Sequence, residues 1–258
     1  MLYLWPRNIQ IMLKPTTESL KKGIFRLLAA LFLLALLPQN TEAKKKKETV
    51  VRMETSAGVI RIELSDETPR HRDNFVKLVR QGYYDGLLFH RVIKDFMIQS
   101  GDPDSRVTLN ERGDSVVNSP SREKPLGEGG PGYELPAEFN LPWLYHVRGA
   151  VAAAREGDDV NPEMRSSGSQ FYIVYGRSWG PSSLGKQRAA LEEKGIEMDR
   201  EMWDDYLLNG GTPHLDGTYT VFGHVIEGIK VVKAIQEKPT DKDDRPLQDI
   251  FIRKATIE

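Results

Sequence analysis

Two consecutive runs near the middle of the chain combine one arginine and one glutamine with large apolar residues. The runs are Phe89-His90-Arg91-Val92-Ile93 and Phe96-Met97-Ile98-Gln99, and both have the composition of β-strands. Two such strands would bring Arg91 and Gln99 onto a shared surface. An arginine offers five rigid donors and stays charged at physiological pH, so it can bind a carbonyl or an amide but cannot act as a general base. The chemistry indicated is electrostatic and breaks no bond.

The overall composition narrows the possible functions. The 258 residues, 39% hydrophobic and 28% charged, are ordinary for a soluble protein of one large or two small domains. A net charge of -1 gives no argument for nucleic-acid binding. The absence of cysteine excludes disulfides, thiolate catalysis and cysteine–zinc sites, and the five scattered histidines show no metal-ligand spacing. We therefore expect no cofactor, no metal and no nucleic acid, and nothing indicates more than a monomer.

The N-terminal segment has the features of a secretory signal. The apolar run Leu27–Leu37 follows several basic residues and precedes Pro38 and small residues up to Ala43. We expect residues 1–43 to be a cleaved signal peptide, residues 44–47 a basic lead-in, and residues 48–258 one exported domain. The predicted location is a bacterial periplasm. The alternative is an uncleaved anchor in the inner membrane, because Ile24 and Phe25 lengthen the apolar stretch.

The mature part shows many short strand-like runs and few helices. A hairpin is expected over 51–64, then a helix that begins after Thr68 and ends near Gly82. Residues 104–131 are polar and rich in glycine and proline, which predicts a surface excursion, whereas 177–212 have helical spacing and predict a helical insertion. With no internal repeat, the pattern favours one closed or nearly closed antiparallel barrel. Further strands are expected at 88–93, 96–99, 149–155, 171–175, 220–225 and 250–252, with a short helix over 229–235.

Several further motifs follow one another along the mature part of the chain. The first is the pair of runs described above, followed by Gly101-Asp102-Pro103. The others are Gly132-Tyr133-Glu134-Leu135-Pro136-Ala137-Glu138-Phe139, Gly168-Ser169-Gln170-Phe171-Tyr172-Ile173, and Leu215-Asp216-Gly217 with Val221-Phe222-Gly223. In this order the motifs resemble those of the cyclophilin-type peptidyl-prolyl isomerases, in a bacterial form. The resemblance covers roughly residues 48–258 apart from the excursion and the insertion, and several blocks in order are far more specific than one short motif.

The resemblance implies a mainly β protein: a closed eight-stranded antiparallel barrel capped by two helices, with a groove for proline on its outer face. Arg91 matches the catalytic arginine of the family, and Gln99 matches the glutamine beside it. Tyr172 stands where many members carry phenylalanine, so its hydroxyl is expected at the rim of the groove. The implied substrate-binding residues are Phe96, Met97, Ala154, Arg155, Gln170, Phe171, Tyr172, His214, Leu215 and Tyr219.

The implied activity agrees with the chemistry of an arginine in an apolar groove. Rotation about an Xaa–Pro amide crosses a barrier of about 18–20 kcal/mol because it breaks the C–N resonance. A guanidinium aimed at the twisted amide stabilises it more than either planar isomer. The expected partners are proline-containing peptides and unfolded exported proteins. A binding module or holdase chaperone with little turnover is the alternative, since binding alone needs only the apolar groove.

Simpler interpretations remain for individual residues. Arg91 could be a structural arginine paired with Asp102 or Glu138. His90 should point to the opposite face of its strand from Arg91 and is interpreted as structural. The insertion either overhangs the groove and selects polypeptides or is a solvated helical decoration, and the sequence favours neither.

Overall fold

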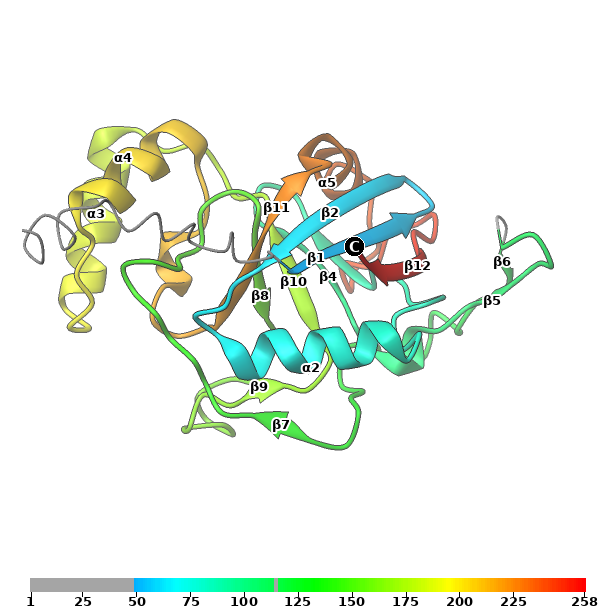
Figure 1. Ribbon diagram of the computed structural model, residues 1–258. Coiled ribbons are helices and arrows are strands. Elements are labelled where there is room, and N and C mark those ends of the chain that lie inside the picture. Colours follow the sequence, from blue (N-terminus) through cyan, green and yellow to red (C-terminus); the bar gives the residue numbers. More distant parts are fainter. Residues whose placement is uncertain (1–48, 114–115) are drawn as a thin grey trace, which may run out of the picture. The chain divides into compact units, whose positions relative to one another are not determined.

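The computed structural model describes residues 49–113 and 116–258, and one eight-stranded antiparallel sheet organises this part of the chain (Figure 1). The strand order is β12-β1-β2-β11-β8-β10-β4-β3. The predicted signal peptide and basic lead-in lie outside the described residues. The strands are β1 (Thr49–Thr55), β2 (Gly58–Leu64), β3 (Arg91–Ile93), β4 (Met97–Ser100), β8 (Ala150–Ala153), β10 (Phe171–Val174), β11 (Val221–Glu227) and β12 (Ile252–Ile257).

The sheet curls into an open half-barrel, so the predicted closed barrel is wrong. Its edge strands, β12 and β3, do not pair along their length. They approach each other only through an isolated bridge between Leu88 and Phe251 and neighbouring backbone hydrogen bonds, such as Phe89 N–H to the Ile250 carbonyl (2.8 Å). The physical reason is that the expected strand over 88–93 is broken: only Arg91–Ile93 continue the ladder with β4.

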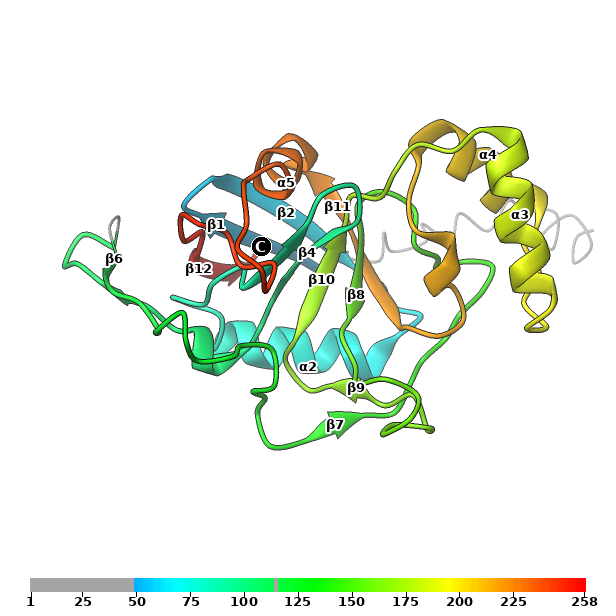
Figure 2. The same cartoon turned by 180° about the vertical axis from the view of Figure 1, so that it is seen from behind.

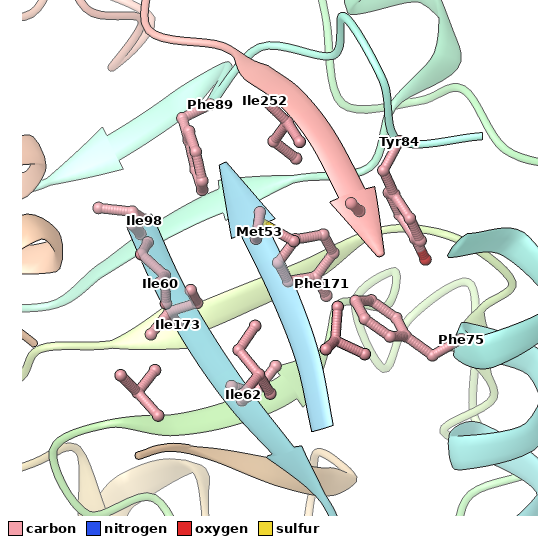
Figure 3. Close-up of a cluster of buried hydrophobic side chains, with 14 of the residues drawn as sticks. Met53, Ile60, Ile62, Phe75, Tyr84, Phe89, Ile98, Phe171, Ile173 and Ile252 are labelled. Atoms are coloured by element: carbon pink, nitrogen blue, oxygen red, sulfur yellow. The ribbon is translucent and has the colours of Figure 1, made fainter. Parts of the chain in front are cut away.

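The main core lies on the concave face of the sheet, under two helices (Figure 3). Val51 and Met53 of β1 and Ile60 and Ile62 of β2 alternate into it, as a period of two requires. The helices that cover it are α2 (Pro69–Arg80) and α5 (Ile229–Gln236), which lie at opposite ends of the sheet in Figures 1 and 2.

The start of α2 is stabilised by a distant carboxylate. Thr68 is the N-cap residue, as expected, but its side chain makes no capping hydrogen bond. Glu138 accepts hydrogen bonds from the backbone N–H groups of Arg70 (3.2 Å) and His71 (3.0 Å), and from His71 Nδ1 (2.6 Å). A carboxylate in this position satisfies orphan donors of the first turn. Glu138 therefore caps the N-terminus of α2 and does not pair with Arg91.

The insertion contains two helices, α3 (Pro181–Glu192) and α4 (Arg200–Asn209). They have a separate apolar core, in which Leu184, Met198 and Met202 pack with the segment 141–147. The insertion is therefore packed against the segment 141–147 through this core. None of the helices in the described part of the chain is long and apolar enough to cross a membrane.

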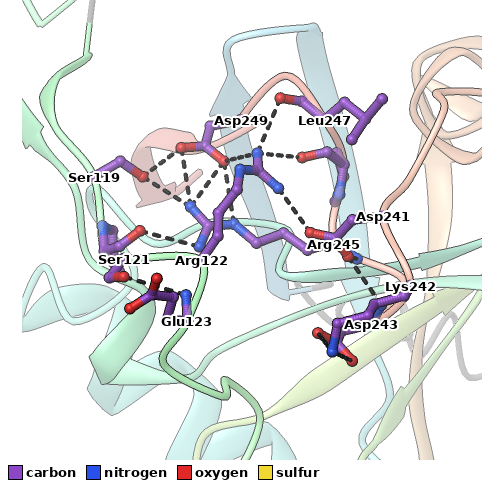
Figure 4. A network of polar contacts seen from close by, with 12 residues as sticks. Ser119, Ser121, Arg122, Glu123, Asp241, Lys242, Asp243, Arg245, Leu247 and Asp249 are labelled. Atoms are coloured by element: carbon purple, nitrogen blue, oxygen red, sulfur yellow. Dashed lines mark hydrogen bonds and ion pairs between the residues drawn. The ribbon is translucent and has the colours of Figure 1, made fainter.

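The excursion is fastened to the loop that precedes β12. Figure 4 shows the guanidinium groups of Arg122 and Arg245 at the carboxylate of Asp249, with shortest N–O distances of 3.4 and 3.0 Å. Arg122 also donates to Asp241 (2.8 Å). Short elements in and around the excursion and the insertion are η1 (Pro103–Ser105), β5 (Thr108–Leu109), β6 (Val116–Asn118), β7 (Glu134–Leu135), β9 (Ser166–Ser167) and η2 (Pro213–Leu215).

Candidate active site

A cavity of about 280 Å³ opens on the outer face of the sheet, and most of the predicted site residues line it. Its floor and walls come from β3, β4, β10, η2 and the neighbouring loops, including the segment that follows β8. The predicted residues that line it are Arg91, Phe96, Met97, Gln99, Ala154, Arg155, Tyr172, Leu215 and Tyr219, and His90, Leu126, Gly127 and Glu128 complete it.

Strand register places the polar residues in one row. Arg91 of β3 lies directly opposite Gln99 of β4, and Gln99 lies opposite Tyr172 of β10. Directly paired residues share one face of a sheet. The Arg91 guanidinium donates to Gln99 Oε1 at 3.4 Å, and Gln99 Nε2 donates to Gln170 Oε1 at 2.9 Å. The two runs identified in the sequence therefore do bring Arg91 and Gln99 together.

The acidic neighbour of Arg91 is neither of those considered from the sequence. Asp102 accepts a hydrogen bond from Asp104 N–H in η1, and Glu138 caps α2. Instead, Arg91 Nε lies 3.6 Å from Asp244 Oδ2, with the two side chains 45% and 42% exposed. A solvated pair of this kind contributes little stability, so the guanidinium keeps most of its donors for a ligand.

The floor of the cavity is apolar and continuous with a second core. Met97 and Tyr172 are buried there, with Phe96 and Leu215 partly buried against them. Arg155 forms part of the far wall: its guanidinium stacks 4.5 Å from the Tyr219 ring centroid and donates to the Thr218 carbonyl (2.7 Å). An apolar floor beside a charged rim is the arrangement that a proline ring and its amide require.

Phe171 was predicted in the groove, and this prediction is wrong. Phe171 is buried in the main core, with its ring edge-on to Phe75 (5.3 Å) and Tyr84 (5.5 Å). Neighbouring residues of a strand point to opposite faces, so Tyr172 and Phe171 cannot both face the groove.

Gln170 and His214 lie beside the cavity and do not line it. Gln170 donates through Nε2 to the carbonyls of Gly127 (2.8 Å) and Gly129 (2.7 Å), and its Oε1 accepts from Gln99. It therefore links the groove to the excursion. His214 stacks on the far side of Phe96, with ring centroids 5.7 Å apart.

The wall formed by residues 126–128 was not predicted. Asp102 accepts a hydrogen bond from Gly127 N–H, which together with Gln170 holds this wall at the groove. A Cβ on Gly129 would lie 2.2 Å from Asp102 Oδ1, so this position needs glycine. The glycines at 127, 129 and 130 could have indicated this wall from the sequence, because glycine often marks a place where the backbone closely approaches another segment.

The hydroxyl of Tyr172 turns away from the rim, contrary to expectation. It lies 2.9 Å from His146 Nε2, and His146 Nδ1 lies 2.8 Å from Asp216 Oδ1. Because the carboxylate can only accept, Nδ1–H donates to it, and Nε2 is left to accept from the Tyr172 hydroxyl. Asp216 also accepts from the hydroxyl of Tyr206 in α4 (2.7 Å). Burial raises the pKa of both tyrosines well above 10, so both remain donors.

Comparison with known proteins agrees with this geometry. The family model for cyclophilin type peptidyl-prolyl cis-trans isomerases matches residues 50–257. The chain belongs to the cyclophilin family.

In the described part of the chain, no cluster of three or more histidine, cysteine or acidic side chains is arranged to hold a metal ion.

Individual relatives cover most of the chain. A protein of Staphylococcus haemolyticus, whose name places it among the peptidyl-prolyl cis-trans isomerases, is 34% identical over 222 residues, which is 86% of this chain and 97% of that protein. A similarly named Staphylococcus aureus protein is 33% identical over 226 residues, covering 87% of this chain and 100% of the relative.

Solved cyclophilins share the fold. A Cryptosporidium parvum cyclophilin matches with a TM-score of 0.55 and 25% identity, covering 82% of this chain and 97% of its own. A structure of that protein in the presence of the dipeptide Ala-Pro gives a TM-score of 0.54 and 24% identity, covering 81% of this chain and 98% of its own.

Replacing Tyr172 by phenylalanine should leave the cyclophilin groove almost unchanged. The ring that faces the groove is kept, so kcat/KM for a proline peptide should change by less than about twofold. The buried Nε2 of His146 loses its donor, which should lower the free energy of unfolding by about 1–2 kcal/mol. Urea unfolding and NMR exchange on the two proteins would measure both effects. A large loss of kcat/KM with normal stability would show that the hydroxyl acts in the groove.

His90 lies at the cavity and not on the opposite face, because it precedes β3 and the alternation of the strand does not apply to it. Burial, opposed by the nearby Asp102, lowers the pKa of His90 to about 4. As the pH falls, this histidine takes up its proton at a higher pH in the unfolded chain than in the folded protein. Protonation therefore favours unfolding, and stability is lost as the pH falls from about 6.5 to about 4.

The stability attributable to His90 should therefore fall by up to about 3 kcal/mol over that interval. The His90→Phe variant keeps a ring of similar size and should show a correspondingly flatter pH dependence in urea unfolding. Other buried histidines titrate equally in both proteins, so the difference between the two curves isolates His90. Parallel curves for the two proteins would contradict the assignment.

Proposed function

We propose that the chain accelerates cis–trans isomerisation of Xaa–Pro bonds by arginine-assisted stabilisation of the twisted amide. The observation that carries the proposal is the position of Arg91 and Gln99, paired across β3 and β4 at the edge of an apolar cavity. The family membership of the chain supports an isomerase of this kind.

The mechanism follows from the charge of Arg91 and the shape of the floor. Phe96, Met97 and Leu215 offer an apolar surface for the pyrrolidine ring. As the amide twists, its nitrogen regains a lone pair, and a guanidinium donor directed there or at the prolyl carbonyl binds the twisted form best. Gln99 orients the guanidinium through Oε1. A bound peptide would exclude water from this half-exposed arginine and strengthen its interaction.

We also propose that the substrates are proline-containing segments of unfolded exported proteins. The support is the basic and apolar sequence of residues 14–43, which lies outside the described residues. N-terminal sequencing of the protein isolated from cell fractions would test this. A mature chain that starts near residue 44 in the exported fraction agrees with a cleaved signal, and an intact N-terminus in the membrane fraction agrees with an anchor.

The direct test of the activity is two-dimensional NMR exchange on an Ala-Pro peptide with a catalytic amount of the protein. Exchange cross-peaks between the cis and trans forms should grow far faster than in the peptide alone. Binding of the peptide without faster exchange would identify a proline-peptide binding module or holdase chaperone instead. If the peptide shows no binding and no faster exchange, the proposal is refuted.

A further inference from the structure

A second cavity, of about 400 Å³, lies on the other side of Phe96 from the groove. It is formed between the turn that joins β3 to β4 and the start and end of the insertion. Phe96 lines both cavities. His214, stacked on Phe96, and Trp179, at the start of the insertion, supply the other aromatic walls. A polypeptide whose proline occupies the groove can therefore continue past Phe96 into this second cavity.

The insertion is held in place at this point. It leaves the sheet at Gly176, whose N–H donates to the Phe96 carbonyl at 2.9 Å. It returns at Gly211, whose N–H donates to the Arg177 carbonyl (3.0 Å) and whose own carbonyl accepts from Trp179 Nε1 (3.0 Å). These bonds fix the second cavity relative to the groove, so a ligand would meet a preformed site.

Two polar groups that line this cavity have no hydrogen-bonding partner in the described part of the chain. The Thr212 hydroxyl is buried and makes no hydrogen bond within residues 49–113 and 116–258. A buried hydroxyl left in this way is costly unless a ligand or water satisfies it. Arg177 stacks its guanidinium 3.9 Å from the Trp179 ring centroid, and in the described chain it forms no side-chain hydrogen bond or ion pair. Stacking orients the guanidinium and leaves the donors at its edge open.

These groups fit one chemical class of ligand. A stacked guanidinium offers parallel donors that match a carboxylate, and the Thr212 hydroxyl can donate as well. Asp95, on the turn, is the acid that lines the cavity among the described residues, and it forms no ion pair with Arg177. We infer that the second cavity is a subsite for an aspartate or glutamate side chain near the proline of the same polypeptide. This inference rests on the proposed function, since the groove must hold that proline.

The test uses the full chain and a series of fluorescein-labelled Ala-Pro peptides that carry glutamate or glutamine at each position on either side of the proline in turn. Fluorescence anisotropy gives the affinity of each peptide. At one or two positions glutamate should bind about fivefold more tightly than glutamine. Arg177→Gln should remove this preference. Asp95→Asn should increase the preference for glutamate peptides, because it removes a negative charge that repels the glutamate side chain.

A matched control lies on the same insertion. Arg188 of α3 pairs with Glu192 (2.9 Å), four residues later, and does not line the cavity. Arg188→Gln makes the same change of charge and should keep the glutamate preference intact. Equal affinity for glutamate and glutamine peptides at every position, or an unchanged preference in Arg177→Gln, overturns the inference.

The outcome is separable from that of the proposed function. NMR exchange on the same peptides reports isomerisation independently of affinity. Isomerisation of both peptide types without a glutamate preference would overturn the subsite alone. A glutamate preference in binding that depends on Arg177, without faster exchange of any peptide, would refute the proposed isomerase and leave an acidic-peptide subsite.

Discussion

Replacing Arg91 by alanine should lower kcat/KM for Xaa–Pro isomerisation by about a hundredfold or more. Removing one preorganised donor from a charge-stabilising site typically costs this much. Arg91 is a half-exposed residue of a short edge strand, and its ion pair with Asp244 is solvated, so the fold should be retained. NMR exchange measures the rate, and the near-UV circular dichroism and urea midpoint of the variant verify its structure.

Arg91→Lys is the informative companion variant. It keeps the charge and loses the planar fork, which donates to Gln99 and, in the proposed mechanism, also to a substrate oxygen. We expect it to retain part of the rate, roughly a tenth of the wild-type kcat/KM. A lysine variant with full activity would show that charge alone is sufficient. An alanine variant with full activity would remove Arg91 from the mechanism.

Asp216→Ala should be the most destabilising single substitution near the groove. The carboxylate is completely buried and accepts three hydrogen bonds, from His146 N–H (2.9 Å), His146 Nδ1 (2.8 Å) and the Tyr206 hydroxyl (2.7 Å). Alanine leaves these donors unpaired in the interior. The free energy of unfolding should fall by about 3–5 kcal/mol, because three buried donors lose their acceptor at once.

The control for this prediction is Asp204→Ala in α4. Asp204 is exposed, and its ion pair within the described residues is a 3.5 Å contact with Arg200, so its loss should change the free energy of unfolding by less than about 0.5 kcal/mol. Urea unfolding of both variants provides the comparison, with m-values showing whether the transition remains two-state. A loss below about 1 kcal/mol for Asp216→Ala would mean that the network contributes little.

The pairing of Arg91 with Gln99 was predictable because it depends on local sequence. The runs that contain Arg91 and Gln99 are separated by a short turn, which fixes their register and places both side chains on one face. The same alternation, applied to β10, would have moved Phe171 into the core and kept Tyr172 at the groove. The error arose because both residues were assigned to the groove from the family motif, without applying the alternation of side chains along a strand.

Other parts of the site depend on contacts between distant segments. Asp244 reaches Arg91 from the loop before β12, and the wall at Gly127 is held by Gln170. The His146–Asp216 pair joins residues 70 positions apart. No local pattern marks such pairs, since composition alone labels these segments as polar surface. The openness of the sheet also escaped prediction, because the residues before Arg91 have strand composition but pair only at Leu88.

The pairing of β1 with β12 has a consequence for the time at which the protein can fold. The first strand of the domain lies between β2 and the last strand, so one edge of β1 stays unpaired until residues 252–257 have been synthesised. The excursion likewise waits for Asp249 and Arg245. Contacts of such large sequence separation form late, because the ends of a long chain segment must first meet. A nascent chain that lacks residues 252–257 therefore has an incomplete sheet, and the full eight-stranded sheet can form only after this segment has left the ribosome.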